Sequence, residues 1–153
     1  MSNQTSNFEV AEVQVSYKPK FKASERPRIT SAKDSFNILL NQWDHNKLEY
    51  IEQFKIMLLN RGNRVLGVME VSQGGFAGTV ADPKVIFSTA LKCCASSIIL
   101  AHNHPSGTLK PSQADINLTR KLKDGGALLD IAVLDHLIIA SEGYYSFADE
   151  GVL

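Results

Sequence analysis

Two histidines and an aspartate form the clearest chemical pattern in the sequence. His102 and His104 follow the apolar run Ser97–Ala101, and Asp115 follows a loop that contains proline and glycine. At the end of a strand, residues i and i+2 project to the same side, so both imidazoles can reach one point. Two imidazoles and a carboxylate suit zinc, and a three-ligand site leaves one coordination position open, as catalytic zinc sites do. The pattern therefore predicts one zinc ion per chain.

Each half of this pattern also has an ordinary structural explanation. Most His-x-His pairs in globular proteins bind nothing, and Ser112 with Asp115 has the spacing of a capping box at a helix start. The combination is more informative than either half. The loop between them contains two prolines and a glycine, which turn the chain from the strand end to the helix start. Asp115, on the first helical turn, can then face back toward the imidazoles.

The elements that must position these groups follow from the periodicity of apolar residues. Alternating or continuous apolar runs predict strands, and apolar residues spaced three and four apart predict helices. Asp82-Pro83 is a strong helix start, with a capping side chain before a proline. The expected strands cover residues 10–17 (an edge strand), 52–59, 64–71, 97–101, 131–140 and 144–147. The expected helices run from Thr30 or Ser31 to about Trp43, from 82 to about 95, and from about Ser112 past Leu122.

Strands that alternate with amphipathic helices, with hairpins at both ends, predict an α/β fold of the α+β type. We expect one mixed β-sheet flanked by helices. A chain of 153 residues has the length of a single domain. The expected organisation is a disordered tail over residues 1–8 and one domain over 9–153. Within that domain, residues 9–44 form an N-terminal strand and helix extension.

Composition limits the classes of function. The 16 basic and 16 acidic side chains cancel, so the whole molecule lacks the positive charge typical of nucleic-acid-binding proteins. Only residues 18–33 are locally basic; we interpret them as a solvated connector, with contact to an acidic partner such as nucleic acid as the alternative. No apolar run approaches the ~20 residues of a membrane span, and the polar N-terminus is no signal peptide. A cytoplasmic protein without a membrane partner is expected.

Four other potential metal ligands are less suitable. Cys93 and Cys94 are adjacent on an expected helix, so their side chains point about 100° apart and cannot both face one metal ion. We expect them to pack in the core of a protein from a reducing compartment. His45 lies in a polar stretch and is expected to be exposed. His136 lies inside an apolar strand, where a structural histidine with satisfied hydrogen bonds is expected.

At these positions the sequence resembles the JAMM (MPN+) family of zinc metalloproteases. The order His102, one residue, His104, seven residues, Ser112, two residues, Asp115 matches the H-x-H-x7-S-x2-D pattern of that family. The resemblance covers roughly residues 45–150. It is closest to the bacterial RadC (JAB-domain) branch, through Ala101–Gly107, Pro111-Ser112 and Leu134-Asp135-His136.

The resemblance implies a JAB/MPN-like fold and a glutamate on an early strand that acts on the metal-bound water. Matching Glu-x-Phe before an apolar run places this glutamate at Glu52, with Glu49 and Glu70 as competitors. Zinc on His102, His104 and Asp115 then lowers the pKa of its water from ~16 toward ~7. The glutamate passes the proton of that water to the leaving amine. Ser112 is implied to hold the developing oxyanion, and its hydroxyl can also cap the helix.

Two functions follow as expectations. The first is a zinc-dependent metallopeptidase or isopeptidase that hydrolyses an amide bond in a peptide or protein substrate. The second is a non-hydrolytic RadC-like module associated with DNA repair or nucleic-acid maintenance. The intact ligand set and the candidate glutamate favour the first, and the basic stretch over residues 18–33 favours the second. No counterpart of the helix-hairpin-helix region of longer RadC proteins is expected here, which argues against autonomous DNA binding. The substrate and the oligomeric state are left open, with Gly74–Gly78 as a candidate rim of a substrate groove.

Overall fold

Within the described part of the chain, five strands form one mixed sheet, and three α-helices and a 3-10 helix accompany it. The computed structural model describes residues 7–74 and 80–153. The strands are β1 (Gln53–Leu59), β2 (Val65–Gln73), β3 (Ser97–Asn103), β4 (Ala132–Ala140) and β5 (Gly143–Ser146). The helices are the 3-10 helix η1 (Ala23–Glu25), α1 (Ala32–Gln42), α2 (Pro83–Lys92) and α3 (Gln113–Leu128). The expected mixed sheet with helices in a single domain is confirmed.

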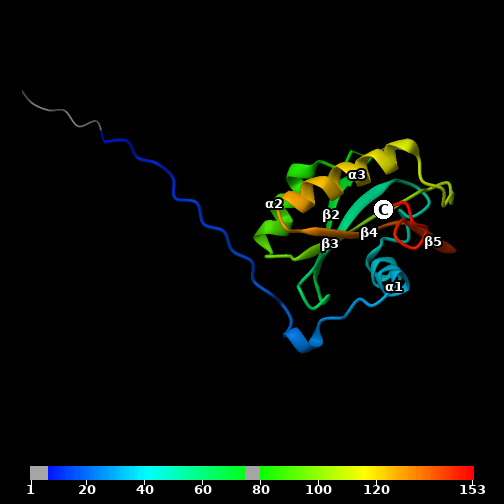
Figure 1. Ribbon diagram of the computed structural model, residues 1–153, viewed down its shortest axis with the longest axis horizontal. Helices are drawn as coiled ribbons and strands as arrows, with labels where there is room; N and C mark the ends of the chain where they lie inside the picture. Colours follow the sequence, from blue (N-terminus) through cyan, green and yellow to red (C-terminus); the bar gives the residue numbers. More distant parts are fainter. Residues whose placement is uncertain (1–6, 75–79) are drawn as a thin grey trace, which may run out of the picture.

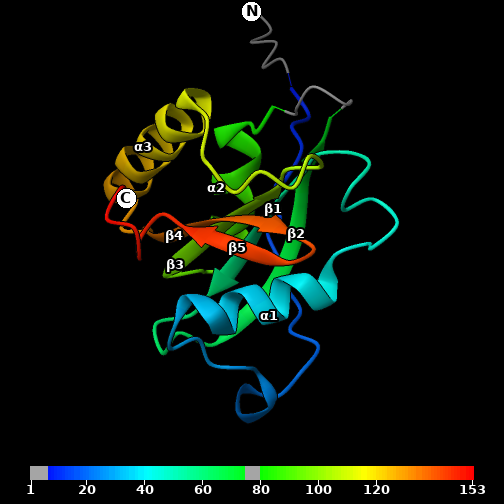
Figure 2. The ribbon, with the colours of Figure 1, turned by 90° about the vertical axis from the view of Figure 1, so that its right-hand side faces the viewer.

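The sheet has the order β2-β1-β3-β4-β5 and lies between two helical layers. Only β3 and β4 run parallel, with α3 as the crossover between them, and the other neighbouring strands are antiparallel. Helix α1 covers one face, and α2 and α3 cover the other (Figures 1 and 2). Successive residues of β3 therefore enter different cores, because side chains alternate across a strand. Ile98 and Leu100 pack toward α2 and α3, whereas Ile99 and Ala101 pack toward α1.

The helix starts form as their sequences predict. The Ser31 side chain accepts a hydrogen bond from the backbone N–H of Asp34 at the start of α1, and Asp82 accepts one from Lys84 before Pro83 in α2. Such a cap satisfies an N–H group that has no partner within the helix and contributes about 1 kcal/mol. The caps fix where each helix leaves the neighbouring loop.

The end of α2 differs from the prediction. The helix stops at Lys92 rather than near Ala95, because Cys94 adopts a left-handed backbone conformation (φ 54°) that breaks the helical path. Cys93 packs half-buried against the core formed with α2 and α3. Cys94 is exposed, so the expectation of core packing is wrong for this residue. Burial raises the pKa of the Cys93 thiol, which keeps it protonated.

The expected edge strand over residues 10–17 is also wrong. Residues 7–17 form neither a strand nor a helix, and the chain extends away from the sheet (Figure 1). Val10, Val13 and Val15 are 70–88% exposed. Alternation of apolar residues suits a strand, but a strand also needs a neighbour that accepts its backbone hydrogen bonds. Here the first anchor is the Tyr17 hydroxyl, which donates to the Leu66 carbonyl (2.8 Å).

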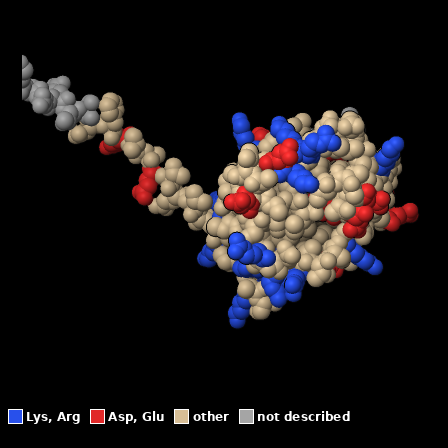
Figure 3. All heavy atoms as spheres, viewed as in Figure 1, with Lys and Arg blue, Asp and Glu red and all other residues tan. Residues whose placement is uncertain are grey.

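The basic stretch after Tyr17 is a connector held against the β1–β2 hairpin. The backbone N–H of Ile29 donates to the Asn63 carbonyl (2.8 Å), and Arg64 Nη1 donates to the Arg26 carbonyl (2.8 Å). Basic side chains gather where the connector reaches the globular part of the molecule (Figure 3). Within residues 7–74 and 80–153, no helix has the length and apolar character to cross a membrane.

Candidate metal centre

The pairing of β1 with β3 brings Glu52 to the two histidines. In this antiparallel pair Phe54 lies opposite His102. Continuing the register by two residues places Glu52 opposite His104, and alternation puts both on the face that carries His102. That face is the one covered by α2 and α3. The site therefore lies where β3 ends and β1 begins, beside the first turn of α3.

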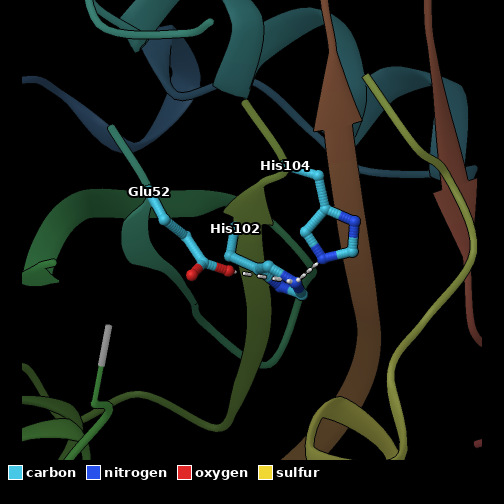
Figure 4. A group of neighbouring side chains, drawn as sticks. All are labelled: Glu52, His102 and His104. Carbon is cyan, nitrogen blue, oxygen red and sulfur yellow. Dashed lines mark hydrogen bonds and ion pairs between the residues drawn. The ribbon is translucent and has the colours of Figure 1, made fainter. Parts of the chain in front are cut away.

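Four side chains converge at this point. The Nε2 atoms of His102 and His104 are 2.9 Å apart. Asp115 spans the pair, with Oδ1 3.4 Å from Nε2 of His102 and Oδ2 3.3 Å from Nε2 of His104. Glu52 Oε1 lies 3.8 Å from Nε2 of His102 (Figure 4). The ligand atoms of Glu52 and the two histidines all lie within 4.8 Å of one another.

These separations are close to those of ligand atoms around a small tetrahedral cation. With bonds of about 2.0–2.2 Å, tetrahedral ligand atoms are about 3.3–3.6 Å apart. The measured distances of 2.9–3.8 Å fall on both sides of that range. The donor set of two nitrogens and two carboxylates is one that zinc accepts. The side chain of His102 is only 2% exposed, whereas the side chains of Glu52, His104 and Asp115 are 15–16% exposed, so the group has one buried member and three at an open rim.

The tautomer of His104 is set by the loop that follows it. Its Nδ1 lies 2.7 Å from the carbonyl oxygen of Thr108, which can only accept a hydrogen bond, so Nδ1 carries the proton. In the neutral ring Nε2 carries the lone pair and faces Asp115 and His102; in the protonated ring Nε2–H points toward Asp115. The loop turns back through Gly107 (φ 82°), a conformation that favours glycine, and Gly107 N–H donates to the His104 carbonyl (2.9 Å). The neighbouring Asp115 carboxylate raises the pKa of His104.

Asp115 belongs to the capping box of α3 as well as to the cluster. Its Oδ2 accepts from the backbone N–H of Ser112 (2.8 Å), and Ser112 Oγ accepts from the backbone N–H of Asp115 (3.0 Å). Burial raises the pKa of this carboxyl, but the imidazoles of His102 and His104 outweigh burial and hold it well below its ordinary value. An ionised carboxylate is thus held between two imidazoles, the form in which it can bind a cation.

The other residues considered from the sequence lie elsewhere or have structural partners. Glu49 is exposed and accepts a hydrogen bond from the Ser141 hydroxyl (3.0 Å). Glu70 accepts from Gln53 Nε2 (2.6 Å), away from the histidines. His45 is exposed, as expected. The candidate rim of a substrate groove was Gly74–Gly78, and its residues from 75 onward lie outside the described residues. The backbone N–H of Gly74 donates to the Glu52 carbonyl (2.9 Å).

His136 is buried and hydrogen-bonded through both ring nitrogens, as expected of a structural histidine. Nε2 lies 2.7 Å from Nδ1 of His102, and Nδ1 lies 2.6 Å from the Thr119 hydroxyl. Complete burial lowers the pKa of His136 well below its ordinary value, so the ring is neutral. Phe147 stacks on it (ring centroids 4.6 Å apart). Sequence reasoning did not anticipate that this ring touches His102.

Asn103 is the second residue whose contribution the sequence did not reveal. It lies between the two histidines and points to the opposite face, where it is completely buried. Its Oδ1 accepts from the backbone N–H of Gln53 (2.7 Å). Its Nδ2 donates to the carbonyls of Leu48 (2.7 Å) and Ile51 (2.9 Å). One amide thus holds the segment that carries Glu52 against the strand that carries the histidines.

We expect Asn103→Asp to destabilise the fold and displace Glu52. The substitution places a carboxylate oxygen against the two carbonyls that now receive Nδ2 hydrogen bonds, and each unsatisfied buried group costs about 1–3 kcal/mol. Urea denaturation should show a loss of at least about 2 kcal/mol in the free energy of unfolding. The exposed Asn46→Ala serves as the control and should change it by at most about 0.5 kcal/mol. Equal stabilities of Asn103→Asp and wild type would contradict this role.

Comparison with known proteins gives a family for this arrangement. The model of the RadC-like JAB domain matches residues 29–152. The chain is 44% identical over 128 residues to a UPF0758 protein of Flavobacterium johnsoniae, which covers 82% of this chain and 53% of the relative. It is 46% identical over 103 residues to a UPF0758 protein of Porphyromonas gingivalis, which covers 67% of this chain and 45% of the relative. The chain spans about half the length of these curated relatives.

Proposed function

The chain belongs to the RadC-like JAB domain family, and from this premise we propose that it is a zinc-dependent hydrolase of peptide or isopeptide bonds. The observation that carries the proposal is the convergence of two imidazole Nε2 atoms and the Asp115 carboxylate within 2.9–3.4 Å of one another, with a second carboxylate beside them. Glu52 supplies that second carboxylate at 3.8 Å. A purely structural zinc site needs four protein ligands, whereas three ligands with a nearby base suit hydrolysis.

In this proposal His102, His104 and Asp115 hold the zinc ion. Asp115 is nearer than Glu52 to the histidine nitrogens, and its two oxygens reach both of them. The tautomer of His104 leaves its Nε2 lone pair free for a cation. Zinc, when bound, supplies a Lewis acid that acidifies water and polarises a carbonyl group.

Glu52 acts as the general base and then as the general acid. Its carboxylate takes a proton from the attacking water while the water oxygen bonds to the scissile carbonyl carbon. It returns that proton to the amide nitrogen as the carbon–nitrogen bond breaks, so a carboxylic acid and an amine leave. The position of Glu52 supports this role, because the side chain is 15% exposed at the rim and lies beside the cluster, one residue before β1.

Ser112 donates a hydrogen bond to the oxygen of the scissile carbonyl. Its hydroxyl uses one lone pair to accept the N–H of Asp115 (3.0 Å). A serine hydroxyl also has one proton to donate, which the cap does not use. The cap and the oxyanion contact therefore use different parts of one hydroxyl. The cap also fixes the side-chain rotamer, so the oxygen is held in place before substrate binds.

A peptide-library cleavage experiment tests the proposal. Zinc-loaded wild-type protein should generate new peptide amino termini, and chelator-treated protein should not. Glu52→Gln, loaded with zinc in the same way, is the matched inactive control. Cleavage by Glu52→Gln at the wild-type rate, or cleavage unaffected by the chelator, would overturn the assignment of a zinc hydrolase.

The basic connector favours a second candidate function, association with nucleic acid. Lys18, Lys20 and Lys22 are all exposed, and Figure 3 shows basic side chains gathered where the connector reaches the globular part of the molecule. If these lysines contact phosphates, the affinity for duplex DNA should fall as salt rises. Replacing all three with glutamine should reduce the slope of log affinity against log salt by about 0.9 per phosphate contact. A slope unchanged by the triple substitution, measured by fluorescence anisotropy, would remove this candidate.

A further inference from the structure

A line of buried hydrogen bonds leads from helix α3 to His102. The Thr119 hydroxyl lies 2.7 Å from the backbone carbonyl oxygen of Asp115, one helical turn earlier. The same hydroxyl lies 2.6 Å from Nδ1 of His136. Nε2 of His136 lies 2.7 Å from Nδ1 of His102. Three short contacts thus connect Asp115 and Thr119 of α3, through the His136 ring of β4, to the His102 ring near the end of β3.

The backbone carbonyl of Asp115 determines which group donates in each of these hydrogen bonds. A carbonyl oxygen can only accept, so the single proton of the Thr119 hydroxyl must point to Asp115. The hydroxyl oxygen then has only lone pairs for His136, whose Nδ1 must carry a proton. A neutral ring with a proton on Nδ1 has a lone pair on Nε2. Nδ1 of His102 must therefore donate to it, which in a neutral ring leaves the lone pair of His102 on Nε2, facing Asp115 and Glu52. The proton in the 2.9 Å contact between the two Nε2 atoms then belongs to His104.

Burial favours this order. The exposed fractions are 0% for His136, 2% for Thr119 and 1% for His102. With so little water contact, a reversed tautomer would set two donors or two acceptors against each other, with no solvent to compensate. A doubly protonated His136 would place an uncompensated cation in an apolar setting. Two aromatic rings form that setting, because Phe54 packs edge-on to His136 (5.6 Å) and Phe147 stacks on it (4.6 Å).

We propose that Thr119 and His136 are positioning residues that fix His102 in the tautomer with a free Nε2 lone pair. The consequence for metal affinity rests on the proposed zinc site, whereas the tautomer itself rests on the hydrogen bonds alone. Asp115 takes part twice, since its carboxylate faces the imidazoles while its backbone carbonyl directs the proton order behind them. His104 needs no such relay because it bonds directly to the carbonyl of Thr108.

Substitution at Thr119 tests the relay. Thr119→Val keeps the shape of the side chain but removes the hydroxyl, so His136 can turn its proton toward His102. Outer hydrogen-bond partners of metal-bound histidines change metal affinity by about 10- to 100-fold. We therefore expect zinc affinity, measured by competition with a chromophoric chelator, to fall by about 10- to 100-fold in Thr119→Val. Thr119→Ser restores the hydroxyl and should restore the affinity.

Thr89→Val is the matched control. The Thr89 hydroxyl makes the same kind of contact to a carbonyl four residues earlier, that of Val85 (2.9 Å), in α2. Its other partner is the Met69 sulfur rather than a histidine. Thr89→Val and Thr119→Val each remove one hydroxyl from a helix, but only Thr119→Val should weaken zinc binding. An equal loss in both variants, or no loss in Thr119→Val, would overturn the relay.

Nitrogen-15 NMR of the histidine rings separates the relay from the zinc proposal. In metal-free wild-type protein, His102 and His136 should each show a protonated Nδ1 and an unprotonated Nε2. This spectrum requires neither metal nor activity nor a substituted protein that folds. A protonated Nε2 on His136 would refute the relay even if zinc binds. The expected spectrum in a protein that binds no zinc would refute the zinc site and retain the relay.

Discussion

Glu52→Gln is expected to retain one zinc ion per chain and to lose about 10²- to 10⁴-fold in turnover, the usual contribution of a positioned general base. Glutamine has nearly the same shape as glutamate but cannot accept a proton at neutral pH. The reduction should appear in kcat on a peptide that wild type cleaves. Glu49→Gln is the matched control, because Glu49 is an exposed glutamate in the same connecting segment whose partner is the Ser141 hydroxyl.

The metal content of Glu52→Gln distinguishes two roles for this carboxylate. Glu52 lies close enough to the histidines to be a ligand in its own right. If Glu52→Gln loses zinc, the glutamate is a ligand and the assignment of the base is wrong. If it binds zinc and keeps full turnover, another group moves the proton. Retained zinc with lost turnover is the pattern that the proposal requires.

His104→Ala is expected to abolish stoichiometric zinc binding. Structural zinc sites bind with about 10–16 kcal/mol from four ligands, so one ligand contributes about 3 kcal/mol, or about 10²-fold in affinity. Only two of the three proposed ligands then remain. Dialysed wild-type protein should contain one zinc ion per chain by inductively coupled plasma mass spectrometry, and His104→Ala should contain none.

His45→Ala is the control for the histidine substitution. His45 is exposed, so its removal tests whether zinc binds adventitiously to surface imidazoles. Zinc content should be the same in His45→Ala and wild type. Stoichiometric zinc in His104→Ala would show that the proposed ligand set is wrong.

The sequence predicted the local elements well because the signals for them are local. The continuous apolar run before Leu59 gave β1, and the Asp82-Pro83 pair gave the start of α2. The capping box at Ser112 was predicted and is present. Each of these depends on residues within one turn or one strand. The end of α2 was missed because a left-handed conformation at Cys94, unlike one at glycine, leaves no mark in the sequence.

The parts that could not be predicted depend on contacts between distant segments. The valines of residues 10–17 alternate as in a strand, but no sheet edge pairs with them within the described residues. Asn103 has no signal in the sequence beyond its place between two histidines, although its amide joins β3 to the start of β1 and the segment before it. The contact of His136 with His102 requires the parallel pairing of β3 with β4, which periodicity does not specify. The prediction that Glu52 lies beside the histidines came from the family resemblance. The register between β1 and β3 is the physical reason for that position.

The register between β1 and β3 also has a consequence for folding. A slip by one residue would send Glu52 and Phe54 to the α1 face and remove the carboxylate from the histidines. On the proposed ligand set, zinc binding would favour the correctly paired sheet over sheets with a shifted register. At a free zinc concentration 100 times the Kd, this selection is worth about 2.7 kcal/mol. The metal ion would thus stabilise the native register between β1 and β3, two strands that lie far apart in the chain.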